Sequence, residues 1–245
     1  MTISNTPPFP VAAHRYAVYF APEPATLAWR AGSHWVGRCA ARGQPLPQLD
    51  IDGVTRTQLE QLTAAPRRYG WHATLKAPFA LAPDVDWLTL QHAVRSLAKG
   101  LRRFQLPPLQ VQRVDDFLAL VPMAQHAANA DIQAATDACV TQLQPLSAAL
   151  SDQELARRRA AGLTPRQDEL LRQWGYPFVF EEYRFHMSLT GALTGTDPAT
   201  VARVHDAAEQ FFADLPALQF SSLALFAEPT PGADFALVDH VGLGQ

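Results

Sequence analysis

Lysine is almost absent from the chain. Lys76 and Lys99 are the two lysines among 245 residues, and 20 basic residues stand against 23 acidic ones, which gives a formal net charge of −3. A protein that coats nucleic acid needs a basic stripe to neutralise phosphates, so this balance argues against that class. It does not exclude a small anionic substrate, because binding depends on local rather than total charge.

Cysteine is equally scarce, and its spacing suits neither a zinc site nor a disulfide framework. Cys39 and Cys139 lie far apart and neither has a CxxC partner, so we expect two buried thiols in a reducing compartment. Residues 1–10 contain no basic region followed by an apolar run, and no segment is apolar for long enough to cross a bilayer. These absences predict a cytoplasmic protein that makes no membrane contact.

Apolar residues, by contrast, are abundant. They make up 48% of the chain against 18% charged residues, the composition of a globular protein with a core. Residues 1–14 are polar, contain proline and are expected to form a flexible lead-in. Strands are predicted at residues 15–20, 69–77, 109–114, 117–121, 183–190, 219–226 and 235–241, and helices at 26–36, 55–64, 84–100, 131–143, 152–174 (interrupted near Gly162 and Pro165) and 200–213.

The order of these elements predicts an α+β fold with short antiparallel connections. Each half of the chain contains a strand–helix–strand–strand run that begins with a histidine-bearing strand. We interpret this as a weak internal duplication of roughly 110 residues. Residues 15–245 would then form a single domain of two lobes, with lobe one centred on residues 69–121 and lobe two on residues 183–241.

Two short segments share one pattern. Residues 72–75 read His-Ala-Thr-Leu and residues 186–189 read His-Met-Ser-Leu, and no other histidine of the chain fits it. Because side chains alternate faces along a strand, His72 shares a face with Thr74, and His186 with Ser188. A lone match of this kind carries little information, but a pair with one match in each half of the chain is informative.

The same alternation extends the set. If each strand is regular, Arg68 and Lys76 lie on the face of His72, and Arg184 lies on the face of His186. Tyr69 is added because it is close to His72 in sequence. Side by side about a pseudo-two-fold axis, the two strands would gather imidazoles, hydroxyls and cations in one cleft.

That combination suits a phosphodiester. One neutral imidazole can take a proton while a charged one gives a proton, since histidine titrates near neutrality. Hydroxyls can bind the non-bridging oxygens, and arginine or lysine can offset the developing charge. A metal site is the competing use, with Glu182 as a third ligand, but no HExxH or HxHxD spacing occurs, so a mechanism without metal or cofactor is favoured.

The paired motifs resemble those of the 2H phosphoesterase superfamily. Three longer segments, RYAVYFAP (15–22), YGWHATLKAPF (69–79) and YRFHMSLTG (183–191), are similar to its branch of phosphonate-metabolism-associated proteins of unknown function. The resemblance extends from about residue 14 to 243.

The resemblance implies a bilobal arrangement of antiparallel sheets flanked by helices, with a central cleft between the lobes. It implies metal-independent hydrolysis of a cyclic phosphodiester or a related small phosphoester, with His72, Thr74, His186 and Ser188 as the catalytic set. Lys76, Arg184, Arg68 and Tyr69 would bind substrate. Which histidine is the acid and which the base stays open.

Two other functions remain as alternatives. One is RNA end processing, as a 2′–5′ phosphodiesterase or ligase, which the low lysine count does not favour. The other is a non-catalytic protein that binds a phosphorylated metabolite. The expected partner is therefore a small phosphodiester, and a monomer is favoured. The arginine run 157–159 is interpreted as a solvated helix face, and Trp29, Trp35 and Trp71 as core.

Overall fold

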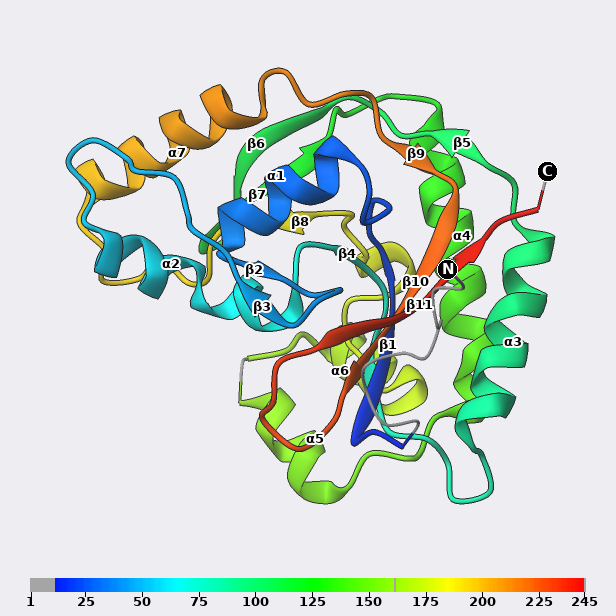
Figure 1. Cartoon of the computed structure of the whole chain (residues 1–245). Coiled ribbons are helices and arrows are strands. Elements are labelled where there is room, and N and C mark those ends of the chain that lie inside the picture. The colour runs from blue at the N-terminus through cyan, green and yellow to red at the C-terminus, as the bar shows by residue number, and fades with distance from the viewer. Residues whose placement is uncertain (1–11, 161, 245) are drawn as a thin grey trace.

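An antiparallel sheet of seven strands forms the centre of the protein (Figure 1). The computed structural model describes residues 12–160 and 162–244. The strand order across the sheet is β11-β10-β1-β4-β8-β7-β6. The strands are β1 (Arg15–Phe20), β4 (Ala73–Phe79), β6 (Leu109–Val114), β7 (Phe117–Pro122), β8 (Met187–Ser188), β10 (Ser222–Glu228) and β11 (Ala236–Gly242). Two small two-stranded sheets pair β2 (Arg38–Cys39) with β3 (Gln44–Pro45) and β5 (Phe104–Gln105) with β9 (Gln219–Phe220).

Helices surround this sheet on several sides. In the view of Figure 1, α3 and α4 stand to the right of the sheet, α1, α2 and α7 lie to the upper left, and α5 and α6 lie below. The helices are α1 (Leu27–Val36), α2 (Arg56–Tyr69), α3 (Trp87–Gly100), α4 (Ala128–Leu143), α5 (Asp152–Arg159), α6 (Pro165–Trp174) and α7 (Pro198–Phe212), with 3-10 turns η1 (Gln144–Leu146) and η2 (Phe180–Glu182). The α+β class with antiparallel strands is thus confirmed. In the described residues, no helix is long and apolar enough to cross a membrane.

Local sequence explains where most helices begin and end. Thr55 with Gln58, Ser151 with Glu154 and Thr164 with Gln167 form reciprocal capping boxes at the starts of α2, α5 and α6. The helix predicted at residues 84–100 begins at Trp87, with Asp86 as its cap, and the helix predicted at 26–36 ends as expected at Val36, followed by Gly37 at φ 77°. The predicted interruption within residues 152–174 is also found, as the break between α5 and α6.

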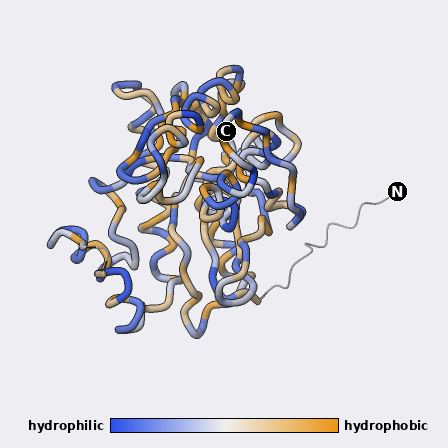
Figure 2. Tube along the Cα trace, turned by 90° about the vertical axis from the view of Figure 1, so that its left-hand side faces the viewer, coloured by the Kyte–Doolittle hydropathy of each residue, from blue (hydrophilic) through white to orange (hydrophobic). Residues whose placement is uncertain are grey.

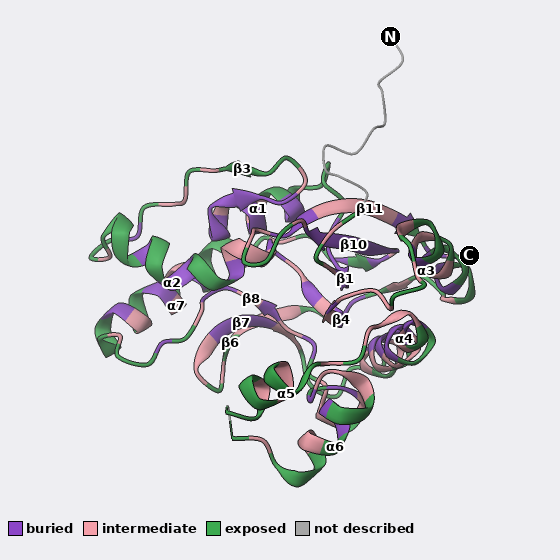
Figure 3. Ribbon diagram, turned by 90° about the horizontal axis from the view of Figure 1, so that it is seen from below, coloured by how far each residue is buried: buried purple, intermediate pink, exposed green. Residues whose placement is uncertain are grey.

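The two faces of the sheet differ in what covers them. Along β1, Tyr16, Val18 and Phe20 join the main core, which also takes residues from α1, α2, α3, α4 and α7. Ala17 and Tyr19 point the other way, into a smaller cluster. Burial follows this plan, since the central strands are buried and the outer faces of the helices are exposed (Figure 3). Hydropathy alternates along the trace, as amphipathic elements require (Figure 2).

Helix α2 corrects one prediction. The helix was expected to end before Pro66 and a strand to begin at Tyr69, yet α2 continues through Pro66 to Tyr69 and β4 starts only at Ala73. Proline lacks the amide that would bond the carbonyl four residues earlier, at Leu62. The amide of Gly191 donates to that carbonyl at 2.6 Å instead. A long-range hydrogen bond therefore allows the helix to tolerate its proline.

The second histidine-bearing strand is also shorter than predicted. Residues 183–190 were expected to form a strand, but only Met187–Ser188 are paired as β8. Beyond Ser188 the amides of Leu189 and Thr190 both donate to the carbonyl of Leu118, which breaks the ladder. The chain then turns towards α7.

Both sides of the sheet draw on both halves of the chain. β10 and β11, from the end of the sequence, extend the β1 and β4 side, while β6 and β7 lie beside β8. We predicted two lobes, centred on residues 69–121 and 183–241. The strands of these two segments do not form separate parts of the sheet, so the lobes stay a prediction. Residues 1–11 of the predicted lead-in lie outside the described residues, whereas the amide of His14 already donates to the carbonyl of Glu228 at 2.8 Å.

Two buried tryptophans give a test of how the second motif is held. Trp35 Nε1 donates to the carbonyl of Leu189 at 2.9 Å, whereas Trp71 Nε1 has no partner among the described residues. Both indoles are almost fully buried, so Trp→Phe removes similar packing at either position. We expect Trp35→Phe to lower the free energy of unfolding by about 1–3 kcal/mol more than Trp71→Phe, because the Leu189 carbonyl loses its partner. Urea denaturation of both variants measures this, and equal losses would contradict it.

Candidate active site

The two histidine motifs meet at the junction of β4 and β8. These strands pair antiparallel with Ala73 opposite Met187, and both of these side chains are fully buried. Continued by one residue in either direction, this register sets His72 beside Ser188 and Thr74 beside His186. All four motif side chains are half-buried on the face opposite Ala73 and Met187. The structure therefore brings together the four residues predicted as the catalytic set.

His72 is oriented through one ring nitrogen. Its Nδ1 lies 2.8 Å from the carbonyl oxygen of Gly70, so Nδ1 donates and Nε2 is left as the free base of a neutral ring. Nε2 lies 3.3 Å from Thr74 Oγ1, and the ring stacks on Tyr19 with centroids 3.7 Å apart. Gly70 adopts φ 76°, and a Cβ there would lie 2.7 Å from the Cβ of Ala40. Glycine is thus needed for the turn that aims this carbonyl at His72.

His186 is oriented in the same way. Its Nδ1 lies 2.8 Å from the carbonyl oxygen of Arg184, again two residues earlier, and its ring lies 5.3 Å from that of Phe117. Each motif thus fixes its imidazole by its own backbone and leaves Nε2 for proton transfer.

Their electrostatic settings differ, however. Burial lowers the pKa of His72 to about 4. The hydrogen bond to the Gly70 carbonyl raises this pKa by a smaller amount, and the charge of His186 lowers it further. Burial also lowers the pKa of His186, but by less. There the carbonyl of Arg184 raises the pKa, its guanidinium lowers it, and the carboxylate of Asp115 raises it. Both imidazoles are therefore harder to protonate than a free histidine, and His72 is the harder of the two.

A groove of about 340 Å³ opens at the motifs. Thr74 and His186 line one side of it, together with Asp115 and Phe117 from the β6–β7 turn. The opposite wall comes from the segment after α6, including Tyr176, Phe178 and Glu182. Sequence reasoning did not predict this wall.

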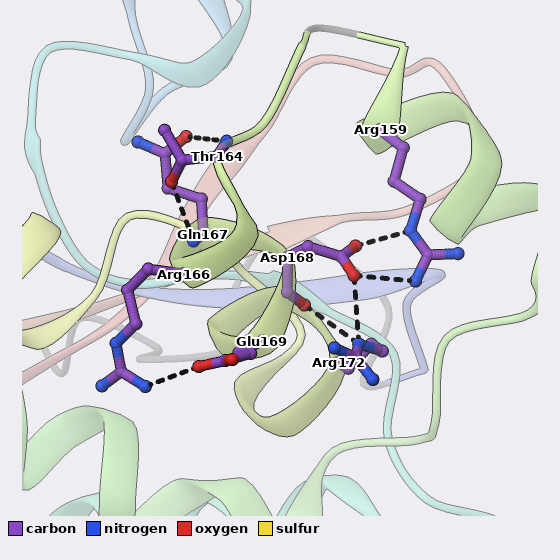
Figure 4. A network of polar contacts seen from close by, with 7 residues as sticks. All are labelled: Arg159, Thr164, Arg166, Gln167, Asp168, Glu169 and Arg172. Atoms are coloured by element: carbon purple, nitrogen blue, oxygen red, sulfur yellow. Dashed lines mark hydrogen bonds and ion pairs between the residues drawn. The ribbon is translucent and has the colours of Figure 1, made fainter.

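Polar contacts organise the α5–α6 pair that carries this wall (Figure 4). Asp168 on α6 accepts from Arg159 of α5 at 2.5 Å and pairs with Arg172 at 3.1 Å. Gln167, which lines the groove, donates to Glu182 at 2.9 Å. Glu182 is thus engaged by the amide of Gln167. Within the described residues, the one group of three side chains that could hold a metal ion is His205, Asp206 and Glu209. This group lies on α7, a different element from the two motifs.

The predicted placement of Lys76 on the face of His72 is wrong. Lys76 pairs with Val18 whereas Thr74 pairs with Tyr19, and a register shift separates the two pairs. Because Val18 and Tyr19 point to opposite faces, this β-bulge turns Lys76 away from the face of Thr74. The side chain is 4% exposed, its Nζ donates to Gln144 Oε1 at 2.9 Å, and burial lowers its pKa to about 8.

The parity argument also fails for Arg68, because Arg68 and Tyr69 end helix α2 rather than lying on a strand. Arg68 is ion-paired with the buried Glu228, and the ring of Tyr69 lies 6.3 Å from that of His72. Arg184 is the one added cation that lines the groove with His186. It is exposed and lies 3.8 Å from Asp115.

The arginine run 157–159 departs from prediction at one position. Arg157 and Arg159 are exposed, as a solvated face requires, but Arg158 is half-buried and donates to the carbonyl of Gly175. Tyr19 was missed as well, although its alternation with Val18 and Phe20 places it on the motif face. Trp29, Trp35 and Trp71 are buried, as predicted for core.

Fold and site together define a class: α+β proteins in which a central antiparallel sheet pairs two His-x-Thr/Ser motifs. Comparison with known families gives a more particular assignment. Residues 74–236 match the model of a protein family of unknown function, DUF1045, and the chain belongs to that family.

Two curated relatives share the name ribose 1,5-bisphosphate phosphokinase PhnN. The relative from Janthinobacterium sp. (strain Marseille) is 41% identical over 224 residues, which cover 90% of this chain and 49% of the relative. That from Laribacter hongkongensis (strain HLHK9) is 39% identical over 230 residues, 94% of this chain and 52% of the relative. The chain spans about half the length of the curated relatives it matches.

The unequal settings of the two histidines predict unequal titrations. We expect the ring of His72 to titrate near pH 4 and that of His186 at a higher pH, as followed by NMR of the ring nitrogens. Because the pKa of His72 is lower in the folded than in the unfolded chain, stability is retained above about pH 6.5 and falls as the pH drops towards 4. This loss is on the order of 3 kcal/mol and should be absent in His72→Gln. A His72 that titrates above His186 would contradict the assignment.

Proposed function

We propose that this protein is a metal-independent phosphodiesterase of the 2H type that opens a small cyclic phosphodiester. The observation that carries the proposal is the paired register of the two motifs. It places two imidazoles, each held through Nδ1 by the carbonyl two residues earlier, beside two hydroxyls on one face. Structural histidines have no need of this equivalence, whereas a general acid and a general base do.

The sheet order supports a pseudo-two-fold relation, but with repeats β1-β4-β6 and β7-β8-β10 that begin one strand earlier than those predicted from the sequence. Read outwards from the β4–β8 junction, β1 and then β10 follow on one side, and β7 and then β6 on the other. β1 and β7 each precede a histidine motif in sequence, and β10 and β6 each follow one. A two-fold axis between Ala73 and Met187 would exchange these strands, with β11 as an addition outside the repeat.

The direction of the pKa difference favours His72 as the base and His186 as the acid. His72, neutral at working pH, takes a proton from water through Nε2 while the water oxygen attacks phosphorus. His186, in its protonated form, gives its Nε2 proton to the leaving ester oxygen as the phosphorus–oxygen bond breaks. One water is consumed, and the products are a phosphomonoester and a free hydroxyl. Thr74 and Ser188 donate to the non-bridging oxygens, and Arg184 offsets negative charge.

The names of the relatives suggest the substrate class. Those proteins are named for phosphorylating ribose 1,5-bisphosphate, a compound with two phosphomonoesters. Hydrolysis of a cyclic phosphodiester that joins two hydroxyls of ribose gives such a monoester. We therefore propose a cyclic phosphate of a ribose phosphate as substrate, in the phosphonate metabolism that the sequence resemblance implies.

The decisive assay tests hydrolysis in the presence of EDTA. We expect ribose 1,2-cyclic phosphates, and more slowly 2′,3′-cyclic nucleotides, to be opened by the chelated protein. His72→Ala and His186→Ala should each lower kcat by about 10²–10⁴-fold, because each removes one proton-transfer group. His205→Ala, which alters a partly exposed histidine of α7, serves as the matched control and should leave kcat unchanged. Loss of activity with EDTA, or full activity in either motif variant, would refute the mechanism.

A further inference from the structure

Next to His72 a buried hydroxyl has no partner. Tyr19 is fully buried, its ring stacks on His72, and its phenolic oxygen has no hydrogen-bond partner among the described residues. A buried hydroxyl without a partner destabilises the fold, so its retention calls for an explanation. A ligand that accepts from this hydroxyl would provide one.

Positive charge gathers around this hydroxyl from two directions. Arg15 lies on β1 with the same alternation as Tyr19 and is mostly buried. It shares the carboxylate of Glu228 with Arg68, so that one buried negative charge lies between two positive ones. The charge of Arg15 in turn acts on Tyr19, where it partly offsets the strong raising of the pKa by burial.

The second direction is the α5–α6 pair. Arg158 extends from α5, donates to the carbonyl of Gly175 and forms no ion pair with a carboxylate in the described residues. Glu154, one turn earlier, is the nearest acid on its helix and is occupied by the capping contacts of Ser151. Burial lowers the pKa of Arg158, as expected for a guanidinium that is incompletely neutralised.

A small cavity continues the groove, and its charged lining residues are Arg15, Lys76, Glu154 and Arg158. Tyr19 does not line this cavity but is close enough to interact electrostatically with Arg15 and Tyr176. Arg15, Arg158 and Tyr176 border a space of about 50 Å³. The cavity and the groove share Ala77, Tyr176 and Val179. A small molecule with one group at Thr74 and His186 can therefore reach the arginines along one path.

We propose that Arg15, Arg158, Tyr19 and Tyr176 form a second anion subsite, which binds a phosphomonoester carried by the same small molecule as the cyclic phosphodiester. The proposal rests on the proposed function and narrows it to substrates with two phosphate groups. Two guanidiniums from facing elements and phenolic hydroxyls match the several oxygens and the double charge of a phosphomonoester. The small volume favours a terminal group over the continuing backbone of an RNA.

The binding arm of the test uses ribose 5-phosphate, which has the monoester but no diester. Calorimetric titration should show that Arg158→Ala weakens binding at least tenfold relative to the wild-type chain. Arg157→Ala, the exposed neighbour on the same helix, should bind as the wild type does. Equal affinities of the two arginine variants would overturn the subsite, and competition by a short RNA at matching strength would reassign it to nucleic acid.

The variant Tyr19→Phe tests the subsite independently, because it does not alter the packing of α5. This change removes only a hydroxyl without a partner, so the melting temperature should be unchanged or raised, while ribose 5-phosphate should bind several-fold more weakly. Unchanged affinity in Tyr19→Phe would remove the hydroxyl from the subsite and contradict the proposal.

A kinetic experiment distinguishes failure of the anion subsite from failure of the proposed phosphodiesterase reaction. With ribose 5-phosphate 1,2-cyclic phosphate, Arg158→Ala should raise KM at least tenfold, whereas ribose 1,2-cyclic phosphate should show the same KM in variant and wild type. Equal KM effects on both would overturn the subsite while leaving the phosphodiesterase intact. Binding of ribose 5-phosphate that depends on Arg158, with no turnover of any cyclic diester, would support the subsite and refute the proposed reaction.

Discussion

The site depends on one backbone pairing, that of Ala73 with Met187. Because side chains alternate along a strand, a slip of β8 by one residue would turn His186 into the core and expose Met187. The buried faces of Ala73 and Met187 therefore determine the register, and the register positions the chemistry. Since β8 has only two residues, other contacts must hold it in place.

Those contacts come from outside the ladder. The carbonyl of Leu118 on β7 accepts the amides of Leu189 and Thr190, and the indole of Trp35 donates to Leu189. The hydroxyl of Thr190 accepts the amide of Leu118 at 3.0 Å. A strand too short to be stable alone is thus fixed by its neighbours, and the histidine that precedes it is fixed with it.

How far the sequence could predict this structure depended on whether the determining contact was local. The end of α1 at Val36 and the hairpin of residues 109–121 follow from neighbouring residues and were found at their predicted places. The bulge that turns Lys76 away depends on the register against β1, and the continuation of α2 past Pro66 depends on Gly191, which is distant in sequence. The alternation rule located the four motif side chains because it had to hold for only three residues in each strand. It failed for Arg68 and Lys76, where it was extended beyond the regular part of β4.

Helix α2 touches both halves of the site. Its end leads directly into Gly70, whose carbonyl orients His72, and its Leu62 carbonyl binds Gly191 just after the second motif. A rotation of α2 would thus displace both imidazoles in the same sense and leave their separation almost unaltered. A substitution that shifts α2 should therefore disturb both histidine motifs together, although no motif residue lies on this helix.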